Sequence, residues 1–318
     1  MGFGHVLVEV KTSRICGSQI GEIDGAKGPD RFLPHLLGHE GGGIVLETGP
    51  EVSRVKPGDR VVLHWRPASG IQSKPVRYNW NGIHVNAGNV TTFQKFTVVS
   101  ENRLTVIPPS IDFDFAALLA DTLTTGFGLI TRDARVEIGH SLVLIGCGGI
   151  GLGAILGAKL AGAHPIIAID LHEHKLAMAH RYGATHTIHA AQSDFSVEVE
   201  RILQGPADIV IDGTGQPQVI EKAYQLTDPK GRCVLFGVMP HDKRVSLHTL
   251  PLHFGKVLTG SEGGQSRPDQ DIPRIVRMKL DGRFETDGFV THRCSLPQVN
   301  DAIAAMRAGH SIHTLIDL

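Results

Sequence analysis

The chain has 318 residues, enough for two domains with substantial hydrophobic cores. With 41% hydrophobic and 20% charged residues it has an ordinary globular composition, and its formal net charge of −1 gives no reason to expect a nucleic acid or an anionic membrane as partner. No apolar run in the sequence approaches the length of a membrane span, and the N-terminus lacks a secretion signal, so we expect a cytoplasmic protein. The four cysteines form no CxxC pair, which argues against a disulfide framework and a cysteine-rich structural zinc site.

The first hundred residues show short β-type runs between glycine- and proline-rich turns, without a helical period. This pattern predicts a compact, glycine-rich β-barrel. Residues 13–19 and 21–34 are interpreted as loops, and residues 64–92 as a polar, irregular segment. The predicted strands are 6–10, 44–46, 60–63, 93–99 and 104–107.

A predicted helix at residues 112–130 leads into a second kind of pattern, in which apolar strands alternate with helices. Such alternation predicts an α/β domain with a parallel, doubly wound sheet. Strands are expected at 142–145, 166–169, 187–188, 209–212, 233–236 and 257–259, with helices such as 175–182 and 218–226 between them. Two further helices, 271–280 and 297–308, and a strand at 314–318 complete the chain.

The strand at 142–145 runs into a GCGGIG turn, followed by a small-residue helix, a second strand and Asp170. This is the order of a dinucleotide-binding βαβ unit. Gly146 is expected to make the tight turn, Gly148 to let a pyrophosphate approach the backbone, and Gly151 to let the helix pack against the strand. The helix start, with Gly149 and Ile150, offers free N–H groups to the phosphates.

Asp170 lies 24 positions after Gly146, where a carboxylate can accept hydrogen bonds from both ribose hydroxyls of the adenosine. A carboxylate repels a 2′-phosphate and no arginine follows it directly, so NAD is favoured over NADP. The alternative is a glycine-rich turn that serves packing alone, but the strand, helix and acid around it argue against that interpretation.

Three separate segments carry candidate metal ligands: Cys16, the pair His39-Glu40, and Asp121. Thiolate, imidazole and carboxylate are ligands that suit zinc, and a catalytic zinc typically has three protein ligands and one open position. Asp121 is a lone carboxylate in an apolar helix and needs a partner if it is buried. Taken singly, each residue could instead be a core cysteine, a structural histidine or a helix cap.

Five motifs occur together along the chain: ICGSQ around Cys16, LLGHEGGGIV around His39, VKPGDRVV, DTLTTGFG beginning at Asp121, and the GCGGIG turn. In this order the chain resembles a zinc-dependent medium-chain alcohol dehydrogenase over nearly its whole length. The resemblance implies a GroES-like β-barrel catalytic domain plus a Rossmann cofactor domain. It implies domains of 1–121 with 263–318 (catalytic) and 122–262 (NAD-binding).

The resemblance also implies a catalytic zinc on Cys16, His39 and Asp121, where most members have a cysteine in place of the aspartate. Glu40 matches a glutamate beside the metal that can coordinate it transiently, and Ser18 matches the hydroxyl residue that contacts the alcohol oxygen and passes its proton outward. Zinc then lowers the pKa of the alcohol, and the alkoxide expels hydride toward the nicotinamide.

For the cofactor, the resemblance implies that Thr125 touches the nicotinamide end and that Lys175 joins Asp170 at the ribose. Phe236, Gly237 and Val238 are expected to line the nicotinamide pocket, although sheet-edge packing is an alternative. His313 stands where many members place an arginine on the pyrophosphate.

Several departures from the family pattern are visible. Gly21 replaces a relay histidine, Gln19 replaces an aspartate that supports the histidine ligand, and residues 63–92 contain no cysteine, so no structural zinc is expected. The chain also begins at what resembles the second or third strand of the family barrel, so either the start is truncated or another surface covers that edge of the barrel.

The sequence therefore predicts a zinc-dependent oxidoreductase that transfers hydride between an alcohol and NAD, giving an aldehyde or ketone, with secondary alcohols, polyols or sugar-like substrates weakly favoured. A homodimer or homotetramer is expected, by analogy with the family, through strands of the nucleotide domain. Two alternatives stay open: a zinc-free quinone or enone reductase of the same superfamily, and a non-catalytic NAD-binding protein.

Overall fold

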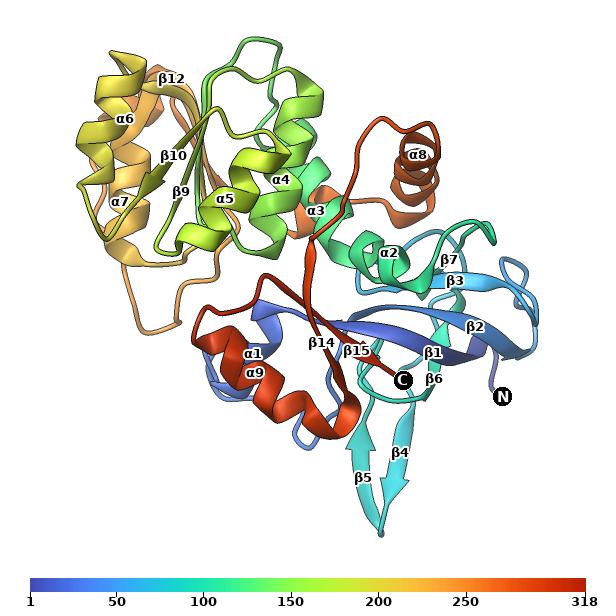
Figure 1. The fold of residues 1–318 in the computed structure, drawn as a ribbon. Coiled ribbons are helices and arrows are strands. Elements are labelled where there is room, and N and C mark those ends of the chain that lie inside the picture. Colours follow the sequence, from blue (N-terminus) through green and yellow to red (C-terminus); the bar gives the residue numbers. More distant parts are fainter. The chain divides into compact units, whose positions relative to one another are not determined.

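The computed structural model describes residues 1–318, which form two compact units (Figure 1). The first comprises Met1–Thr124 and Ser266–Leu318, and the second Thr125–Gln265. The boundaries expected from the sequence lie three residues earlier at both crossings, after residues 121 and 262.

The first unit is built on a sheet in which β1 (His5–Ile15) is the longest strand. The strand order is β14-β15-β1-β2-β3-β7, and β6 also pairs with β1. Val6, Val8 and Val10 of β1 are fully buried, and they share one hydrophobic core with residues of β2, β3 and β6. The other strands are β2 (Glu40–Thr48), β3 (Arg60–His64), β6 (Phe96–Ser100), β7 (Leu104–Val106), β14 (Val290–Ser295) and β15 (His313–Asp317).

The loop predicted at residues 13–19 is wrong. Strand β1 continues through Ile15 because residues Thr12 to Ile15 pair with β15 from the far end of the chain, a partner that local sequence does not reveal. Helix α1 (Gly17–Ile23) then begins directly after Cys16, where Gln19 accepts a hydrogen bond from the Cys16 backbone N–H.

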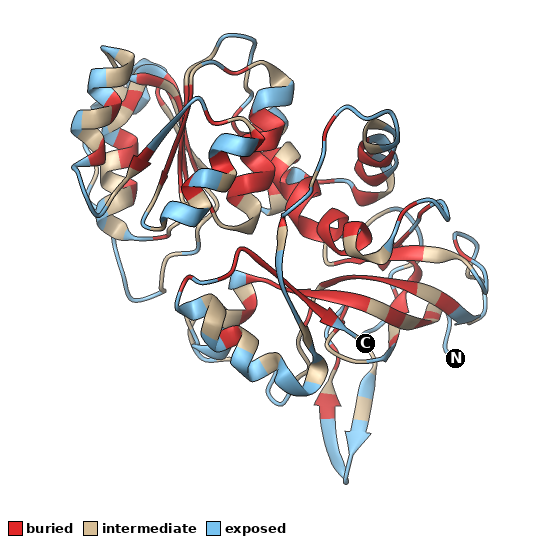
Figure 2. Cartoon of the chain, viewed as in Figure 1, coloured by how far each residue is buried: buried red, intermediate tan, exposed pale blue.

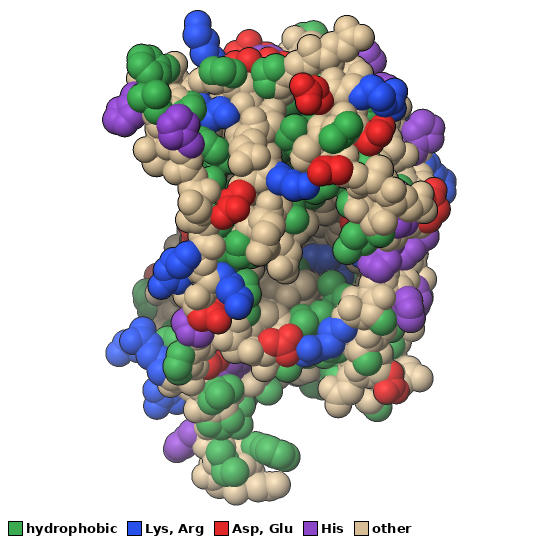
Figure 3. All heavy atoms as spheres, turned by 90° about the vertical axis from the view of Figure 1, so that its left-hand side faces the viewer, with side chains coloured by type: hydrophobic (Ala, Val, Ile, Leu, Met, Phe, Trp, Pro, Cys, Tyr) green, Lys and Arg blue, Asp and Glu red, His purple; other side chains and the backbone are tan.

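The segment 64–92, predicted to be irregular, contains a two-stranded hairpin, β4 (Arg77–Trp80) and β5 (Ile83–Asn86). Its turn is Asn81-Gly82, with φ of +50° and +84°, the dipeptide that two-residue hairpin turns favour. Trp80 and Ile83 beside the turn are 68% and 52% exposed, and hydrophobic side chains gather at this tip at the bottom of Figure 3.

A helical run from Phe113 to Asp133 contains α2 (Phe113–Leu118), a π-type turn η2 (Leu119–Leu123), α3 (Thr124–Gly128) and a second π-type turn η3 (Leu129–Asp133). Its 21 residues are long and apolar enough to cross a membrane, which corrects the expectation that no segment reaches that length. Because 83% of its apolar window is buried inside the protein, it has the character of a core helix.

The second unit is a six-stranded sheet of order β10-β9-β8-β11-β12-β13, with every pair parallel. The predicted doubly wound parallel sheet is therefore present, and the residues of its central strands are mostly buried (Figure 2). The strands are β8 (Leu142–Ile145), β9 (Ile166–Asp170), β10 (His186–His189), β11 (Ala207–Asp212), β12 (Thr227–Leu235) and β13 (Val257–Gly260).

Helices α4 (Gly149–Ala161), α5 (Glu173–Tyr182), α6 (Phe195–Leu203) and α7 (Pro217–Leu226) connect these strands. Helix α6 was not predicted, although Asp194 caps it by accepting a hydrogen bond from the Ser196 N–H at 2.9 Å. Helices α8 (Pro268–Leu280) and α9 (Val299–Arg307) belong to the first unit. Short 3-10 turns complete the chain: η1 (Glu101–Arg103), η4 (Leu250–Phe254), η5 (Gly263–Gln265) and η6 (Leu296–Gln298).

Candidate active site

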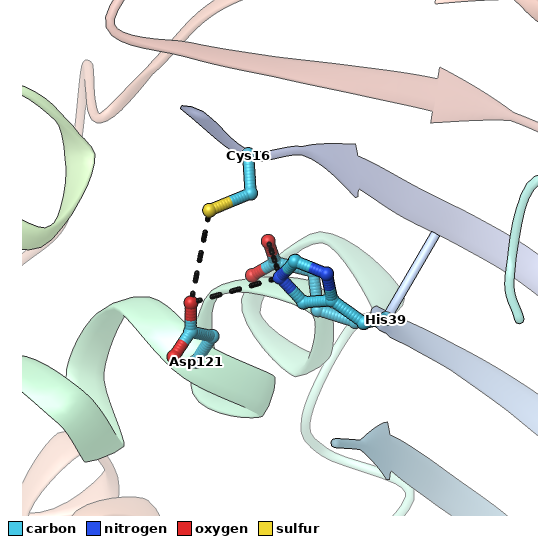
Figure 4. A group of neighbouring side chains, drawn as sticks. Cys16, His39 and Asp121 are labelled. Atoms are coloured by element: carbon cyan, nitrogen blue, oxygen red, sulfur yellow. Dashed lines mark hydrogen bonds and ion pairs between the residues drawn. The ribbon is translucent and has the colours of Figure 1, made fainter. Parts of the chain in front are cut away.

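Four side chains from three distant segments of the first unit converge on one point: Cys16, His39, Glu40 and Asp121 (Figure 4). Their potential ligand atoms all lie within 4.8 Å of one another. Cys16, Glu40 and Asp121 are buried, whereas His39 is partly exposed. The structure thus brings together the three predicted metal ligands and the glutamate expected beside them.

Cys16 stands at the junction of β1 and α1, which directs its thiol into the cluster. Its Sγ lies 3.8 Å from Asp121 Oδ2. Ser18, in the first turn of α1, has its Oγ 3.5 Å from His39 Nε2. The predicted hydroxyl residue therefore lies beside the ligand cluster.

His39 directs Nε2 into the cluster, 3.5 Å from Glu40 Oε1 and 3.9 Å from Asp121 Oδ2. Its other ring nitrogen, Nδ1, lies 3.2 Å from Gln19 Nε2. Gln19 is fully buried and takes the place of a supporting residue for the imidazole, the function left in doubt by the absence of an aspartate.

Asp121 lies in the π-type turn η2, an irregularity that is frequent at functional sites. Its Oδ1 accepts a hydrogen bond from Trp65 Nε1 at 3.1 Å, while Oδ2 faces Cys16 and His39. Trp65, which follows β3, has no sequence signal for its role as a partner of Asp121, because the two residues are 56 positions apart in the chain.

Arg14, which the sequence analysis did not single out, lies behind the cluster and is 1% exposed. Its Nε donates to Glu40 Oε2 at 2.8 Å, and its Nη2 lies 2.8 Å from Glu40 Oε1 and 3.8 Å from Asp121 Oδ2. Burial by itself lowers the pKa of Arg14, but the contacts with Glu40 and the nearby Cys16 and Asp121 raise it above its usual range. Arg14 is therefore a permanent buried cation.

Burial raises the pKa of Glu40 to about 8; Cys16 and Asp121 add to the rise, and Arg14 and His39 oppose it. Arg14 is thus the one arginine whose charge offsets three acidic side chains, those of Glu40, Cys16 and Asp121. The cluster combines a thiol, an imidazole and two carboxylates, and these are donor groups that bind Zn²⁺.

In the second unit, the glycine turn after β8 has the geometry that a phosphate cradle requires. Gly146 has a φ of +100°, and a Cβ on Gly151 would lie 2.2 Å from the Gly146 carbonyl oxygen. A Cβ on Gly148 would meet no protein atom within 4 Å, so the space in front of this residue is open. Gly149 and Ile150 begin α4, whose N-terminus faces the turn.

Asp170 ends β9 beside this turn. Its Oδ2 accepts from the Cys147 N–H at 2.8 Å and its Oδ1 from the His172 N–H at 3.0 Å, which holds the carboxylate at the carboxyl edge of the sheet. Lys175 lies in the first turn of α5 and is partly buried. Both residues stand where the adenosine ribose of a dinucleotide is expected.

Phe236, Gly237 and Val238 follow β12 at the same edge of the sheet. The Phe236 ring covers Gly213, where a Cβ would lie 2.1 Å from it, and Val238 is 59% exposed. Thr125 is buried in α3, and its carbonyl closely approaches Gly264. The three residues after β12 lie at the carboxyl ends of the strands, whereas Thr125 comes from a helix outside the sheet.

His313 is fully buried in the first unit, with Nδ1 3.1 Å from Arg14 Nη1 and its ring stacked on Phe289 at 5.6 Å between centroids. Burial and the charge of Arg14 lower its pKa well below the usual value, so the imidazole is neutral. In this arrangement it exposes no atom to a cofactor, and a contact with the pyrophosphate is not part of the proposed site.

Comparison with known families and proteins shows to which family this chain belongs. Residues 2–109 match the family described as alcohol dehydrogenase GroES-like domain, and residues 149–278 match the family described as zinc-binding dehydrogenase. The chain is 32% identical to an alcohol dehydrogenase class-3 from Cereibacter sphaeroides over 98% of its own length and 92% of that protein. The chain belongs to the zinc-dependent medium-chain alcohol dehydrogenases.

Other members of the family extend the comparison. An S-(hydroxymethyl)glutathione dehydrogenase from Paracoccus denitrificans is 32% identical, over 98% of this chain and 92% of that protein. The crystal structure of benzyl alcohol dehydrogenase from Acinetobacter calcoaceticus superposes with a TM-score of 0.90 at 25% identity, covering 100% of this chain and 93% of that one. The 2R,3R-butanediol dehydrogenase from Bacillus subtilis gives a TM-score of 0.80 at 25% identity, covering 100% and 93%.

Membership in the medium-chain alcohol dehydrogenases confirms the predicted combination of a GroES-like domain and a Rossmann-type parallel sheet. It also confirms the predicted activity: the protein is an oxidoreductase that uses zinc and NAD to interconvert an alcohol and a carbonyl compound. The zinc-free reductase and the non-catalytic NAD-binding protein are correspondingly disfavoured.

Proposed function

We propose that Cys16, His39 and Asp121 hold one catalytic zinc ion and that the first unit is the catalytic domain. The observation that carries this proposal is the convergence of these donors, with Glu40, within 4.8 Å. When bound there, zinc supplies a Lewis acid that polarises the alcohol oxygen. Because Cys16 and Asp121 contribute two negative charges and His39 none, zinc and its three ligands are formally neutral.

The residues of the chain itself orient the substrate and handle its proton. Ser18 Oγ, 3.5 Å from His39 Nε2, lies where it can accept the proton of an alcohol bound at the cluster and pass it toward solvent. Gly21 offers no side chain for a further relay, so the proton leaves Ser18 to water. The buried Arg14 and the partly buried Trp65 keep Glu40 and Asp121 in place during this transfer.

The second unit is proposed to bind NAD on the carboxyl edge of its sheet, with the pyrophosphate over residues 146–151. Asp170 and Lys175 would hold the adenosine ribose, and the Asp170 carboxylate would exclude the 2′-phosphate of NADP. Thr125, Phe236, Gly237 and Val238 would contact the nicotinamide end.

We also propose that the catalytic zinc has no structural counterpart, because residues 63–92 contain no cysteine and fold in part into the β4–β5 hairpin. Cys16 is the one cysteine in the donor cluster. All four cysteines of the chain are free thiols, which fits a reducing, cytoplasmic location. A homodimer or homotetramer is proposed through the edge of the nucleotide-binding sheet.

The substrate is proposed to be a secondary alcohol, a polyol or a sugar-like alcohol. The names of the relatives widen the panel worth testing to benzyl alcohol, 2,3-butanediol and S-(hydroxymethyl)glutathione.

A single experiment tests the zinc site and the cofactor choice together. Purified protein is analysed for zinc and then assayed against the alcohol panel with NAD and with NADP. We expect about one zinc per chain, turnover with NAD, and loss of both zinc and turnover in Cys16→Ser and Asp121→Asn. The matched control is Cys294→Ser, which removes a thiol of the same unit outside the cluster.

Turnover that survives without zinc in Cys16→Ser would overturn the proposed metal site. Equal or better rates with NADP would contradict the role of Asp170. Two zinc ions per chain would contradict the absence of a structural site.

A further inference from the structure

The Arg14 guanidinium is a buried cation whose contacts are all within the first unit. It lies between Glu40, Asp121 and His313, and its side chain is 2% exposed. His313 on β15 is neutral and supplies no charge, so the electrostatic partners of Arg14 are the acidic groups of the ligand cluster, Glu40 first.

The two oxygens of Glu40 are held differently. Oε2 accepts a directed hydrogen bond from Arg14 Nε at 2.8 Å. Oε1 lies 2.8 Å from Arg14 Nη2, but the pair does not meet hydrogen-bond geometry, and both atoms are buried without a hydrogen-bond partner. Oε1 is also the oxygen that faces His39 Nε2 at 3.5 Å, inside the ligand cluster.

The charges of the metal site show why the two Glu40 oxygens need to be held differently. With zinc, a thiolate and the Asp121 carboxylate adding to zero, the Glu40 carboxylate is balanced by Arg14 alone. Without that arginine, a buried carboxylate a few ångströms from a divalent cation would gain most by binding it directly. A fourth protein ligand would then occupy the position that a catalytic zinc keeps open.

We propose that Arg14 is a positioning residue that restrains Glu40 and so keeps the fourth coordination position of the zinc site open. The Nε–Oε2 hydrogen bond anchors the carboxylate, and the Nη2 contact competes with the metal for Oε1. This inference rests on the proposed zinc site.

The test uses the full-length protein with Co²⁺ in place of zinc, because the visible spectrum of Co²⁺ reports its coordination. Imidazole serves as the neutral probe of the open position, so that loss of a positive charge does not by itself change its binding. We expect the wild-type protein to bind imidazole with a clear spectral change. Arg14→Met should bind imidazole roughly tenfold or more weakly and Co²⁺ more tightly, since Glu40 becomes a ligand.

Two further variants keep the test decisive. Arg14→Met combined with Glu40→Gln should restore imidazole binding, because the added ligand is gone. Arg14→Lys retains the charge but makes fewer contacts, so its imidazole affinity should fall between wild type and Arg14→Met. Arg60→Met, which removes an arginine of the same sheet bonded to the Ile111 carbonyl, is the control and should match wild type.

The experiment distinguishes failure of the proposed zinc site from failure of the proposed restraint by Arg14. A wild-type protein that binds neither zinc nor Co²⁺ would overturn the proposed metal site itself. Normal metal binding with imidazole affinity unchanged in both Arg14→Met and Arg14→Lys would overturn the restraint by Arg14 and leave the metal site standing.

Discussion

At the scale of single residues, three members of the ligand cluster, Asp121, His39 and Glu40, are each held by one neighbouring side chain. Trp65 holds Asp121, Gln19 holds His39, and Arg14 holds Glu40. These supporting residues fix which atom of each ligand faces the cluster. Gln19 is also a position where this chain departs from the family pattern, so we expect it to influence the metal affinity of the site.

The Gln19 side chain has a specific limitation. Its one acceptor oxygen is used by the Cys16 N–H at 2.6 Å, which leaves only the amide nitrogen, a donor, facing His39 Nδ1. An imidazole that binds zinc through Nε2 needs an acceptor for its Nδ1–H. Gln19→Glu offers two acceptor oxygens, and we expect it to tighten zinc binding roughly tenfold.

Competition with a chromophoric chelator measures this affinity. Gln298→Glu is the matched control, because Gln298 accepts a similar capping bond from the Ser295 N–H at 3.0 Å without approaching the cluster. An unchanged zinc affinity in Gln19→Glu would show that the amide already supports His39 adequately.

His64 is a buried histidine outside the ligand cluster, bonded to the Arg66 carbonyl at 2.7 Å and to Thr105 Oγ1 at 2.9 Å. Burial, aided by the charge of Arg103, lowers its pKa to about 4 from the ordinary 6.5. Between these values the unfolded chain binds a proton that the folded protein does not. The free energy of unfolding should therefore fall as the pH drops from 6.5 toward 4, by at most about 3 kcal/mol from this residue.

Denaturant unfolding at about pH 7.5 and about pH 4.5 checks this expectation. His64→Gln should lose stability at the higher pH and show a smaller loss on acidification. His186→Gln, which replaces an exposed histidine, should keep the wild-type pH dependence. A wild-type slope in His64→Gln would assign the acid sensitivity to other groups.

At the scale of elements, both functional regions lie where regular structure is interrupted. Asp121 occupies a π-type turn within a helical run, and the phosphate turn occupies the junction of β8 and α4. The glycines of that junction have separable tasks: Gly151 lets helix and strand approach, whereas Gly148 leaves space for a ligand.

This separation predicts opposite behaviour for two alanine substitutions. Gly151→Ala places a Cβ 2.2 Å from the Gly146 carbonyl and should destabilise the protein by about 1–3 kcal/mol. Gly148→Ala meets no protein atom and has a φ of −71°, so thermal stability should be unchanged while NAD binds roughly tenfold more weakly. Thermal unfolding and fluorescence titration with NADH distinguish the two. Tight NADH binding in Gly148→Ala would place the pyrophosphate elsewhere.

At the scale of the whole molecule, the nucleotide-binding sheet ends at β13, which pairs only with β12. Leu250 and Phe254 of the neighbouring turn η4 are 54% and 70% exposed. An open strand edge beside exposed apolar side chains is a surface that a second copy of the chain can cover.

If the proposed oligomer forms through this edge, Phe254→Asp should shift the protein toward the monomer. Leu280→Asp, at an apolar side chain of the first unit that is 54% exposed, should not. Sedimentation velocity at several protein concentrations measures the shift. A wild-type monomer, or an oligomer unaffected by Phe254→Asp, would rule out this interface.

The sequence by itself determined the parallel sheet, its glycine turn and the acid at the end of β9, because these depend on local order and spacing along one βαβ unit. It also indicated Cys16, His39, Glu40 and Asp121, since each lies in a motif that resembles the family. It predicted β1 too short and placed α1 in a loop, because the strand pairs with β15 at the other end of the chain.

Only the tertiary structure decided what supports the site. Arg14, Trp65 and Gln19 contact their partners across 26, 56 and 20 positions of sequence, and His313 reaches Arg14 across 299. No local period or spacing encodes such contacts, because each depends on where β1, β3, η2 and β15 pack in the folded first unit. The ligands could be predicted from motifs, whereas the charges and hydrogen bonds that hold them could be found only in three dimensions.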